Sequence, residues 1–150
     1  MRFLLGVICL ILCLFVGYIL SQKFSCKRMF YSDFKNFNER LITEVSFSQK
    51  TISQLIINND NDFYNLVSNK ISGREYVIPR YLKREEYEFL NDYFSNIGKS
   101  DKYTQMLYLN SVKNQIDNCF NKSKEDEKKY KTLYVKMGFL IGLIILVVLL

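Results

Sequence analysis

The chain has 150 residues, a net charge of +6 and no histidine. This length allows at most one small domain outside any membrane segment. Without histidine the chain lacks the commonest general base, the Ser-His and Cys-His nucleophile pairs and most zinc sites, so we expect no enzyme and no catalytic, cofactor or metal site. Nucleic-acid binding is disfavoured as well, because the chain has no basic stripe with interleaved aromatic residues and no zinc motif.

Both ends of the chain carry apolar runs long enough to cross a bilayer. Residues 3–20, FLLGVICLILCLFVGYIL, contain no charge and reach about 27 Å as a helix. A cleaved signal peptide is the alternative, but no small-x-small cleavage site follows the run. Residues 137–150, MGFLIGLIILVVLL, extend to Leu133 if Lys136 snorkels. We therefore predict an N-terminal transmembrane helix over residues 1–22 and a C-terminal one over residues 133–150.

Basic residues next to the spans predict the orientation of the segment between them. Lysine and arginine flank membrane helices mainly on the cytoplasmic side, and Arg2 is the only one on the far side. The inner flanks carry Lys23, Lys27, Arg28, Lys122, Lys124, Lys128, Lys129, Lys131 and Lys136. Residues 23–132 should therefore form a cytoplasmic domain whose basic flanks meet anionic membrane lipids.

The four cysteines do not predict a disulfide framework. Cys9 and Cys13 lie within the first span, and Cys26 and Cys119 are far apart in sequence. We interpret all four as small apolar filler that the cytoplasm keeps reduced.

The segment after the first span predicts a series of helices. Apolar residues three and four apart indicate one face of a helix that continues out of the membrane, with Asn38 among the polar residues between them. These apolar residues are Phe30, Phe34, Phe37, Leu41 and Val45. A second short helix begins at Ile52. A third carries Phe63, Leu66, Val67 and Ile71 and ends at Gly73.

Two further helices follow an extended connector around Pro79. The first runs from about residue 83 to 97, with Glu85 and Glu86 stabilising its positive end. The second starts after Ser100 or Asp101 and continues into the C-terminal span. Its predicted heptad seam consists of Leu109, Val112, Ile116, Cys119, Ser123, Asp126, Tyr130, Leu133 and Met137. The sequence thus predicts an all-α, membrane-anchored helical bundle with two long antiparallel helices that continue into the terminal spans.

The stretch NIGKSDKYTQ contains Gly98, Lys99 and Ser100, the triplet that closes a phosphate-binding loop. Such a loop needs a glycine five residues earlier, where Tyr93 stands, and a preceding β-strand, where the spacing indicates a helix. We interpret Gly98 as a glycine that ends one helix in the left-handed backbone conformation, and Ser100 or Asp101 as the N-cap of the next helix.

With these elements placed, the sequence resembles the stage III sporulation protein AB family of endospore-forming bacteria over nearly its whole length. FLLGVICLILCLFVGY and KTLYVKMGFLIGLIILVVLL resemble the family's two spans, and IGKSDKYTQ resembles its turn. The matching motif residues are Gly98, Ser100, Asp101, Gln105, Gly138 and Gly142, and more loosely residues 41–47, LITEVSF. Lys102 stands where the family usually has arginine, and SQKTI lacks a proline that is common there.

The resemblance implies a non-enzymatic part of the complex that links mother cell and forespore, anchored in the membrane around the forespore. The family is similar in its soluble part to the cytoplasmic domain of the type II secretion inner-membrane F protein, a helical bundle. Expected partners are other proteins of the complex, including its cytoplasmic ATPase, stage III sporulation protein AA. An alternative is a sensor with an extracytoplasmic bundle, which the basic flanks oppose. A small lipid-binding protein is a weaker reading.

Gly138 and Gly142 share one face of the second span, where another helix backbone can approach closely. The partner is either the first span, which has Gly6 and Gly17 nearly on one face, or another subunit. The alternative is that glycine is merely common in membrane helices.

We expect the purified segment from about residue 24 to 131 to bind no ATP, because Gly98 and Asp101 form a turn and not a phosphate loop. Asp101→Ala should lower the melting temperature by a few degrees through loss of a helix cap. Lys99→Ala should change almost nothing. Saturable, magnesium-dependent ATP binding that Lys99→Ala abolishes would refute this interpretation.

Overall fold

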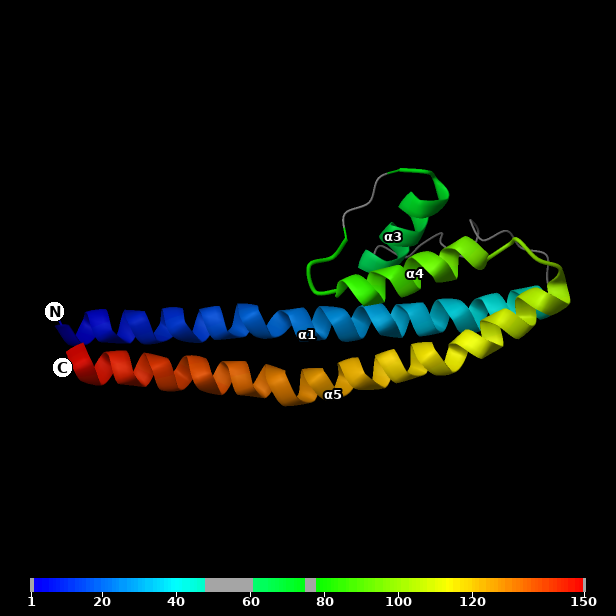
Figure 1. Ribbon diagram of the computed structural model, residues 1–150. Helices are drawn as coiled ribbons and strands as arrows, with labels where there is room; N and C mark the ends of the chain where they lie inside the picture. The colour runs from blue at the N-terminus through cyan, green and yellow to red at the C-terminus, as the bar shows by residue number, and fades with distance from the viewer. Residues whose placement is uncertain (1, 48–60, 75–77, 150) are drawn as a thin grey trace. The chain divides into compact units, whose positions relative to one another are not determined.

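The computed structural model describes residues 2–47, 61–74 and 78–149. These residues form the helices α1 (Arg2–Phe47), α3 (Asp62–Ile71), α4 (Arg84–Asn96) and α5 (Lys102–Leu149), with no strand among them (Figure 1). The predicted all-α class with two long helices is confirmed. The short helix expected from Ile52 lies outside the described residues, as does part of the connector before Pro79.

The chain divides into two compact units. The membrane unit contains residues 1–28 and 122–150, and the bundle unit contains residues 29–121. Helices α1 and α5 contribute to both units, whereas α3 and α4 belong to the bundle unit. The predicted domain boundaries at residues 22 and 132 mark where the chain enters a membrane. The division into compact units does not test those boundaries, so they stay predictions.

The core of the bundle unit is built mainly from aromatic rings. The α1 face predicted by the apolar spacing is buried at Phe30, Phe34, Phe37 and Leu41. The ring of Phe63 in α3 lies at its centre, 5.3 Å between centroids from both Phe30 and Phe34 and 5.5 Å from Phe37. The other helices add Tyr64, Leu66, Val67, Leu90, Tyr93, Leu109, Val112 and Ile116. Rings packed edge to face or offset contribute beyond the area they bury, so α1 and α3 are held together strongly.

One polar residue of α1 was misassigned by the spacing. Asn38 was expected among the outward polar residues, but its side chain is 1% exposed. Its Oδ1 accepts a hydrogen bond from the Tyr93 hydroxyl at 2.8 Å, and its Nδ2 donates to the Leu109 carbonyl at 3.3 Å. These two bonds join α1, α4 and α5 inside an otherwise apolar core and satisfy an amide that could not be buried alone.

Gly73 ends α3 in the way the sequence predicts. It follows the last turn with a φ of 65°, a left-handed conformation that costs glycine little. The backbone N–H of Gly73 donates to the Lys70 carbonyl at 3.3 Å, and that of Arg74 donates to Asn69 at 3.0 Å. This pair of bonds is a Schellman motif, which satisfies carbonyls that the helix itself leaves without donors.

The two acidic residues near the start of α4 stabilise the N-terminal end of that helix. Glu85 and Glu86 both lie in the first turn, where the partial positive charge of the helix end favours carboxylates. Glu86 also accepts the backbone N–H of Lys83 at 2.8 Å. The glutamates therefore act on the helix end, as predicted.

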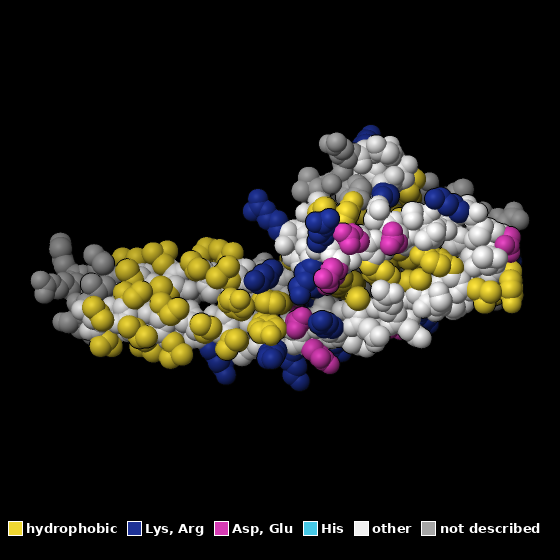
Figure 2. All heavy atoms as spheres, viewed as in Figure 1, with side chains coloured by type: hydrophobic (Ala, Val, Ile, Leu, Met, Phe, Trp, Pro, Cys, Tyr) yellow, Lys and Arg dark blue, Asp and Glu magenta, His cyan; other side chains and the backbone are white. Residues whose placement is uncertain are grey.

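The membrane unit exposes the apolar surface that a bilayer requires. Helices α1 and α5 are both long and apolar enough to cross a membrane, and only 11% of the most apolar 18-residue stretch of each is buried. A core helix of a water-soluble protein would be mostly buried. Figure 2 shows hydrophobic side chains over the visible face of this unit, with Lys and Arg gathered where that surface ends.

The heptad seam predicted for α5 is wrong at its C-terminal end, at Leu133 and Met137. Leu109, Val112, Ile116 and Ser123 are buried as expected. Beyond them, Leu133 and Met137 are 45% and 49% exposed, whereas Tyr134 is half-buried and Gly138 is buried. In this unit the side chains that face outward are as apolar as those facing inward, so hydrophobic spacing no longer marks the contact face.

We predict that Tyr93→Phe lowers the free energy of unfolding of the bundle by about 1–2 kcal/mol, because it leaves the buried Asn38 Oδ1 without its donor. The exposed Tyr103 provides the matched control, since Tyr103→Phe removes a hydroxyl from the surface. Chemical denaturation of the full chain in detergent measures both variants. Equal stability of the two variants would contradict a structural role for the Asn38–Tyr93 bond.

Candidate functional site

The described residues contain no group of three or more His, Cys, Asp or Glu side chains close enough to hold a metal ion. A concavity on α1 is lined by Asn36, Glu39, Arg40, Thr43 and Glu44. The Thr43 hydroxyl in it donates to the Glu39 carbonyl of its own helix at 3.0 Å. The motif residues predicted from the sequence lie in two places. These are the turn between α4 and α5, and the contact between α1 and α5 in the membrane unit.

The α4–α5 turn brings together Gly98, Ser100 and Gln105 from the predicted motif. Gly98 has a φ of 76°, which an L side chain rarely adopts. The Gln105 Oε1 accepts the backbone N–H of Gly98 at 2.9 Å and the Ser100 hydroxyl at 3.4 Å. The Gln105 side chain is buried and therefore ties the first turn of α5 back to the end of α4.

Asp101, the fourth residue of the motif, stands at the start of α5. Its Oδ2 accepts the backbone N–H groups of Tyr103 at 3.1 Å and Thr104 at 3.2 Å. Hydrogen bonds from the Thr104 side chain and backbone hold the pKa of Asp101 below its ordinary value of 3.8. This contribution to stability is present above the unfolded-state pKa and is lost as pH falls through the lowered folded-state pKa.

The geometry around Lys99 differs from that of a phosphate loop. Tyr93, at the place of the first loop glycine, is a fully buried residue in α4. Lys99 itself is exposed. The described residues before Gly98 are helical, so the strand that precedes a phosphate loop is replaced by α4.

Lys102 contacts the far end of α1. Its Nζ donates to the Ser46 carbonyl at 2.9 Å, and the last turn of α1 contains no basic residue of its own. A cation is favoured at the negative end of a helix, so α5 supplies the charge that α1 lacks. Sequence reasoning noted only that Lys102 stands in place of an arginine and identified no contact.

In the membrane unit, three glycines lie where the backbones of α1 and α5 come close to each other. A Cβ on Gly138 would lie 2.8 Å from the Cys13 carbonyl oxygen, and one on Gly17 would lie 2.9 Å from that of Tyr134. A Cβ on Gly142 would lie 3.1 Å from Leu10 Cα. Gly138 and Gly142 therefore both face the first span of the same chain, one of the two partners that the sequence left open.

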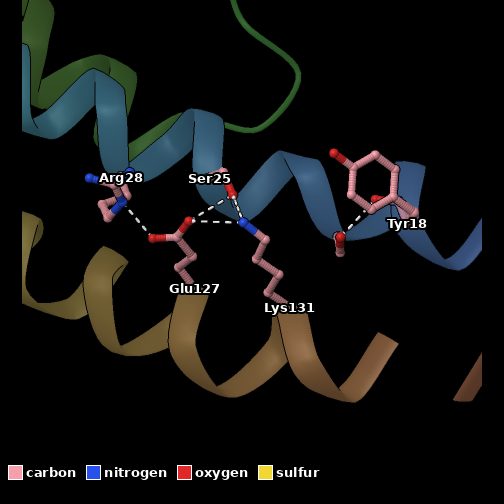
Figure 3. Close-up of polar contacts among 6 residues, drawn as sticks. Tyr18, Ser25, Arg28, Glu127 and Lys131 are labelled. Atoms are coloured by element: carbon pink, nitrogen blue, oxygen red, sulfur yellow. Dashed lines mark hydrogen bonds and ion pairs between the residues drawn. The ribbon is translucent and has the colours of Figure 1, made fainter. Parts of the chain in front are cut away.

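Sequence reasoning missed a polar cluster formed by Ser25, Arg28, Glu127 and Lys131 (Figure 3). The Glu127 carboxylate pairs with the Arg28 guanidinium, accepts the Ser25 hydroxyl at 2.7 Å and lies 3.6 Å from the Lys131 Nζ. Lys131 also donates to the Ser25 Oγ at 3.0 Å. The four-residue spacing of Glu127 and Lys131 was the available signal, but it shows nothing of the partners on α1.

The surroundings of Glu127 keep it charged. Burial acts to raise its pKa, but the hydrogen bond from Ser25 and the charge of Arg28 outweigh burial and hold the pKa below its ordinary value of 4.5. The resulting stabilisation is present above the unfolded-state pKa and is lost as pH falls through the folded-state pKa. At neutral pH the carboxylate therefore joins α1 to α5 beside the apolar surface.

We predict that Gly138→Ala lowers the stability of the full chain in detergent by about 1–3 kcal/mol, because the added methyl group forces two backbones apart. Gly6→Ala is the matched control, since its Cβ would make an ordinary 3.6 Å contact with Leu146 Cγ. Thermal unfolding followed by circular dichroism compares the two. A Gly138→Ala variant as stable as Gly6→Ala would mean that the spans do not pack at this glycine.

We predict that Lys102→Met lowers stability by a few tenths to about 1 kcal/mol, because the end of α1 loses its cation. Lys102→Arg should retain wild-type stability, since a guanidinium can donate to the same carbonyl. Lys99→Met controls for loss of a charge from the same turn. The contact is unimportant if the melting temperatures of Lys102→Met and Lys99→Met coincide at low salt.

Comparison with known protein families identifies a match over the C-terminal part of the chain. The model of the family described as stage III sporulation protein AB matches residues 57–150, which include α3, α4, the turn and α5. No curated protein and no solved structure matches the chain. Because the match covers more than half of the sequence, the chain belongs to the stage III sporulation protein AB family.

Proposed function

We propose that this chain is a non-enzymatic membrane platform of the stage III sporulation complex between mother cell and forespore. In this role it couples a cytoplasmic ATPase, stage III sporulation protein AA, to membrane components of a secretion-like channel. Family membership supports the place in sporulation.

The observation that carries the proposal is that α1 and α5, of 46 and 48 residues, each supply both a span and a wall of the bundle. A partner that binds the bundle thus acts on the same two helices that meet the membrane. The glycine contacts hold the two spans as a pair, and the Asn38–Tyr93 bond holds the helices of the bundle in register. Such a scaffold suits assembly, because the packed helices of the bundle hold the side chains of a binding surface in place.

The proposal requires the bundle to be cytoplasmic, because the ATPase and its nucleotide are there. The basic residues of the inner flanks outnumber the single Arg2 on the far side, which favours this orientation. The sensor alternative requires the reverse orientation. Topology therefore separates the two functions before any partner is known.

Cysteine labelling decides the topology. Cys119 is half-buried and packs against the core, so a labelled residue should be placed at the exposed Asn114 instead. In a variant with the four native cysteines replaced by serine, Asn114→Cys should react with a membrane-impermeant maleimide only after permeabilisation. Labelling of intact cells would overturn the cytoplasmic bundle and favour the sensor.

Co-purification tests the partners directly. The full chain, tagged and solubilised from sporulating cells, should retain the AA ATPase together with membrane subunits of the complex. The Gly138→Ala variant, which alters the membrane unit alone, should retain the ATPase. Retention of membrane subunits without the ATPase, in wild type, would refute the coupling role and leave an anchoring role.

A further inference from the structure

The net positive charge of the chain comes from the membrane unit. The membrane unit contains ten Lys and Arg against three Asp and Glu, a net charge of +7, whereas the bundle unit contains eleven against twelve, a net charge of −1. Apart from Arg2, all the basic residues of the membrane unit lie in residues 23–28 and 122–136. They flank the apolar stretches, after that of α1 and before that of α5, so the charge lies where a bilayer surface would meet the helices.

Two of these lysines lie over a group of aromatic rings. The Lys23 Nζ lies 5.0 Å from the Phe24 ring centroid and 5.2 Å from that of Tyr134. The Lys129 Nζ lies 5.3 Å from the centroid of Tyr130, which stacks on Phe24 at 5.3 Å. Phe24 also lies 5.7 Å from Tyr134. These five residues form one contiguous feature, the lysine–aromatic cluster.

The cations of this cluster differ from those of the polar cluster. Arg28 and Lys131 both form ion pairs with the Glu127 carboxylate. Lys23 and Lys129 are both exposed, and neither forms an ion pair with a described residue. Their ammonium groups are held by ring faces, which attract a cation without neutralising it. The positive charge at Lys23 and Lys129 therefore remains available to an anion from outside the chain.

The chemistry of the cluster fits a phosphate group at a membrane surface. Lysine ammonium groups and the tyrosine hydroxyls of Tyr130 and Tyr134 are donors to phosphate oxygens. Aromatic rings are also favoured at the level of lipid headgroups, with an apolar body and a polar tip. The adjoining apolar surface of α1, which exposes Phe15 and Ile19, would contact acyl chains. A free phosphate ion would use only the first of these features.

We propose that the lysine–aromatic cluster binds the phosphate headgroup of an anionic phospholipid. The lipid lies against both helices, because Lys23 and Phe24 come from α1 and Lys129, Tyr130 and Tyr134 come from α5. Bound lipid thus adds a contact that bridges the two spans. This inference depends on membrane insertion and is independent of any ATPase contact.

The test compares lipid binding by the full chain purified in detergent. Phosphatidylglycerol added to the micelles should raise the melting temperature, and phosphatidylcholine should not. The double variant Lys23→Gln/Lys129→Gln should require at least about tenfold more phosphatidylglycerol for the same rise. The matched control, Lys122→Gln/Lys124→Gln, removes the same charge from exposed positions of α5 and should respond like wild type.

Two further experiments test whether the site is specific for lipid. A variant that preserves the charge shows whether the cluster still folds, and a competing ion shows whether the site binds free phosphate. The variant Lys23→Arg/Lys129→Arg should keep most of the response, which shows that the cluster still folds. Inorganic phosphate should not compete with the lipid at millimolar concentration. An equal loss in both glutamine variants would overturn the site in favour of diffuse attraction, and competition by inorganic phosphate would overturn the lipid as ligand.

Discussion

The membrane unit depends on the close approach of two backbones, which is possible only where side chains are absent. Lipid tails are as apolar as leucine, so burying apolar surface between two spans gives little driving force, and packing contacts must supply it. Gly17 and Gly138 lie against each other, with 3.5 Å between a Cβ on Gly17 and the Gly138 Cα. Gly142 allows a second close approach, next to Leu10 of α1. The antiparallel pairing of α1 and α5 in this unit follows from these contacts.

The bundle unit is held by a different balance of forces. Its aromatic core is buried from water, so the hydrophobic effect favours assembly of the described helices there. That force has little direction, however, and the rings alone allow several arrangements. The buried amide of Asn38 accepts a hydrogen bond from Tyr93 on α4 and donates one to Leu109 on α5, so a shift of either helix would break one of these bonds. Polar groups of this kind select a register because any other arrangement leaves them without partners.

The sequence predicted the elements well because they depend on local patterns. The buried face of α1 at Phe30, Phe34 and Phe37 follows from spacing, and the end of α3 follows from the single residue Gly73. The burial of Asn38 could not be predicted, since it depends on a hydroxyl 55 residues away in the chain. The predicted α5 seam was wrong at Leu133 because, within a membrane, the side of a helix that faces lipid is as apolar as the side that faces another helix.

The sequence allowed us to predict which residues belong to the candidate site, but not most of the contacts that they make. Gly98 and Asp101 carry local backbone signals, and the glycine spacing of Gly138 and Gly142 marks a face. Which helix occupies that face depends on tertiary structure, as does the long-range contact of Lys102 with Ser46. The lysine–aromatic cluster was visible only as a basic flank, because the stacking of Phe24 on Tyr130 joins two ends of the chain.

We expect the two spans of one chain to form an antiparallel pair in the membrane. Cysteine cross-linking tests it most directly, in a variant whose native cysteines are replaced by serine. Gly6 and Leu146 are neighbours across the pair, whereas Ile144 is 64% exposed. Oxidation in native membranes should give a rapid cross-link within one chain for Gly6→Cys/Leu146→Cys and none for Gly6→Cys/Ile144→Cys. Cross-links between chains, or equal reaction of both variants, would contradict the pairing described for α1 and α5.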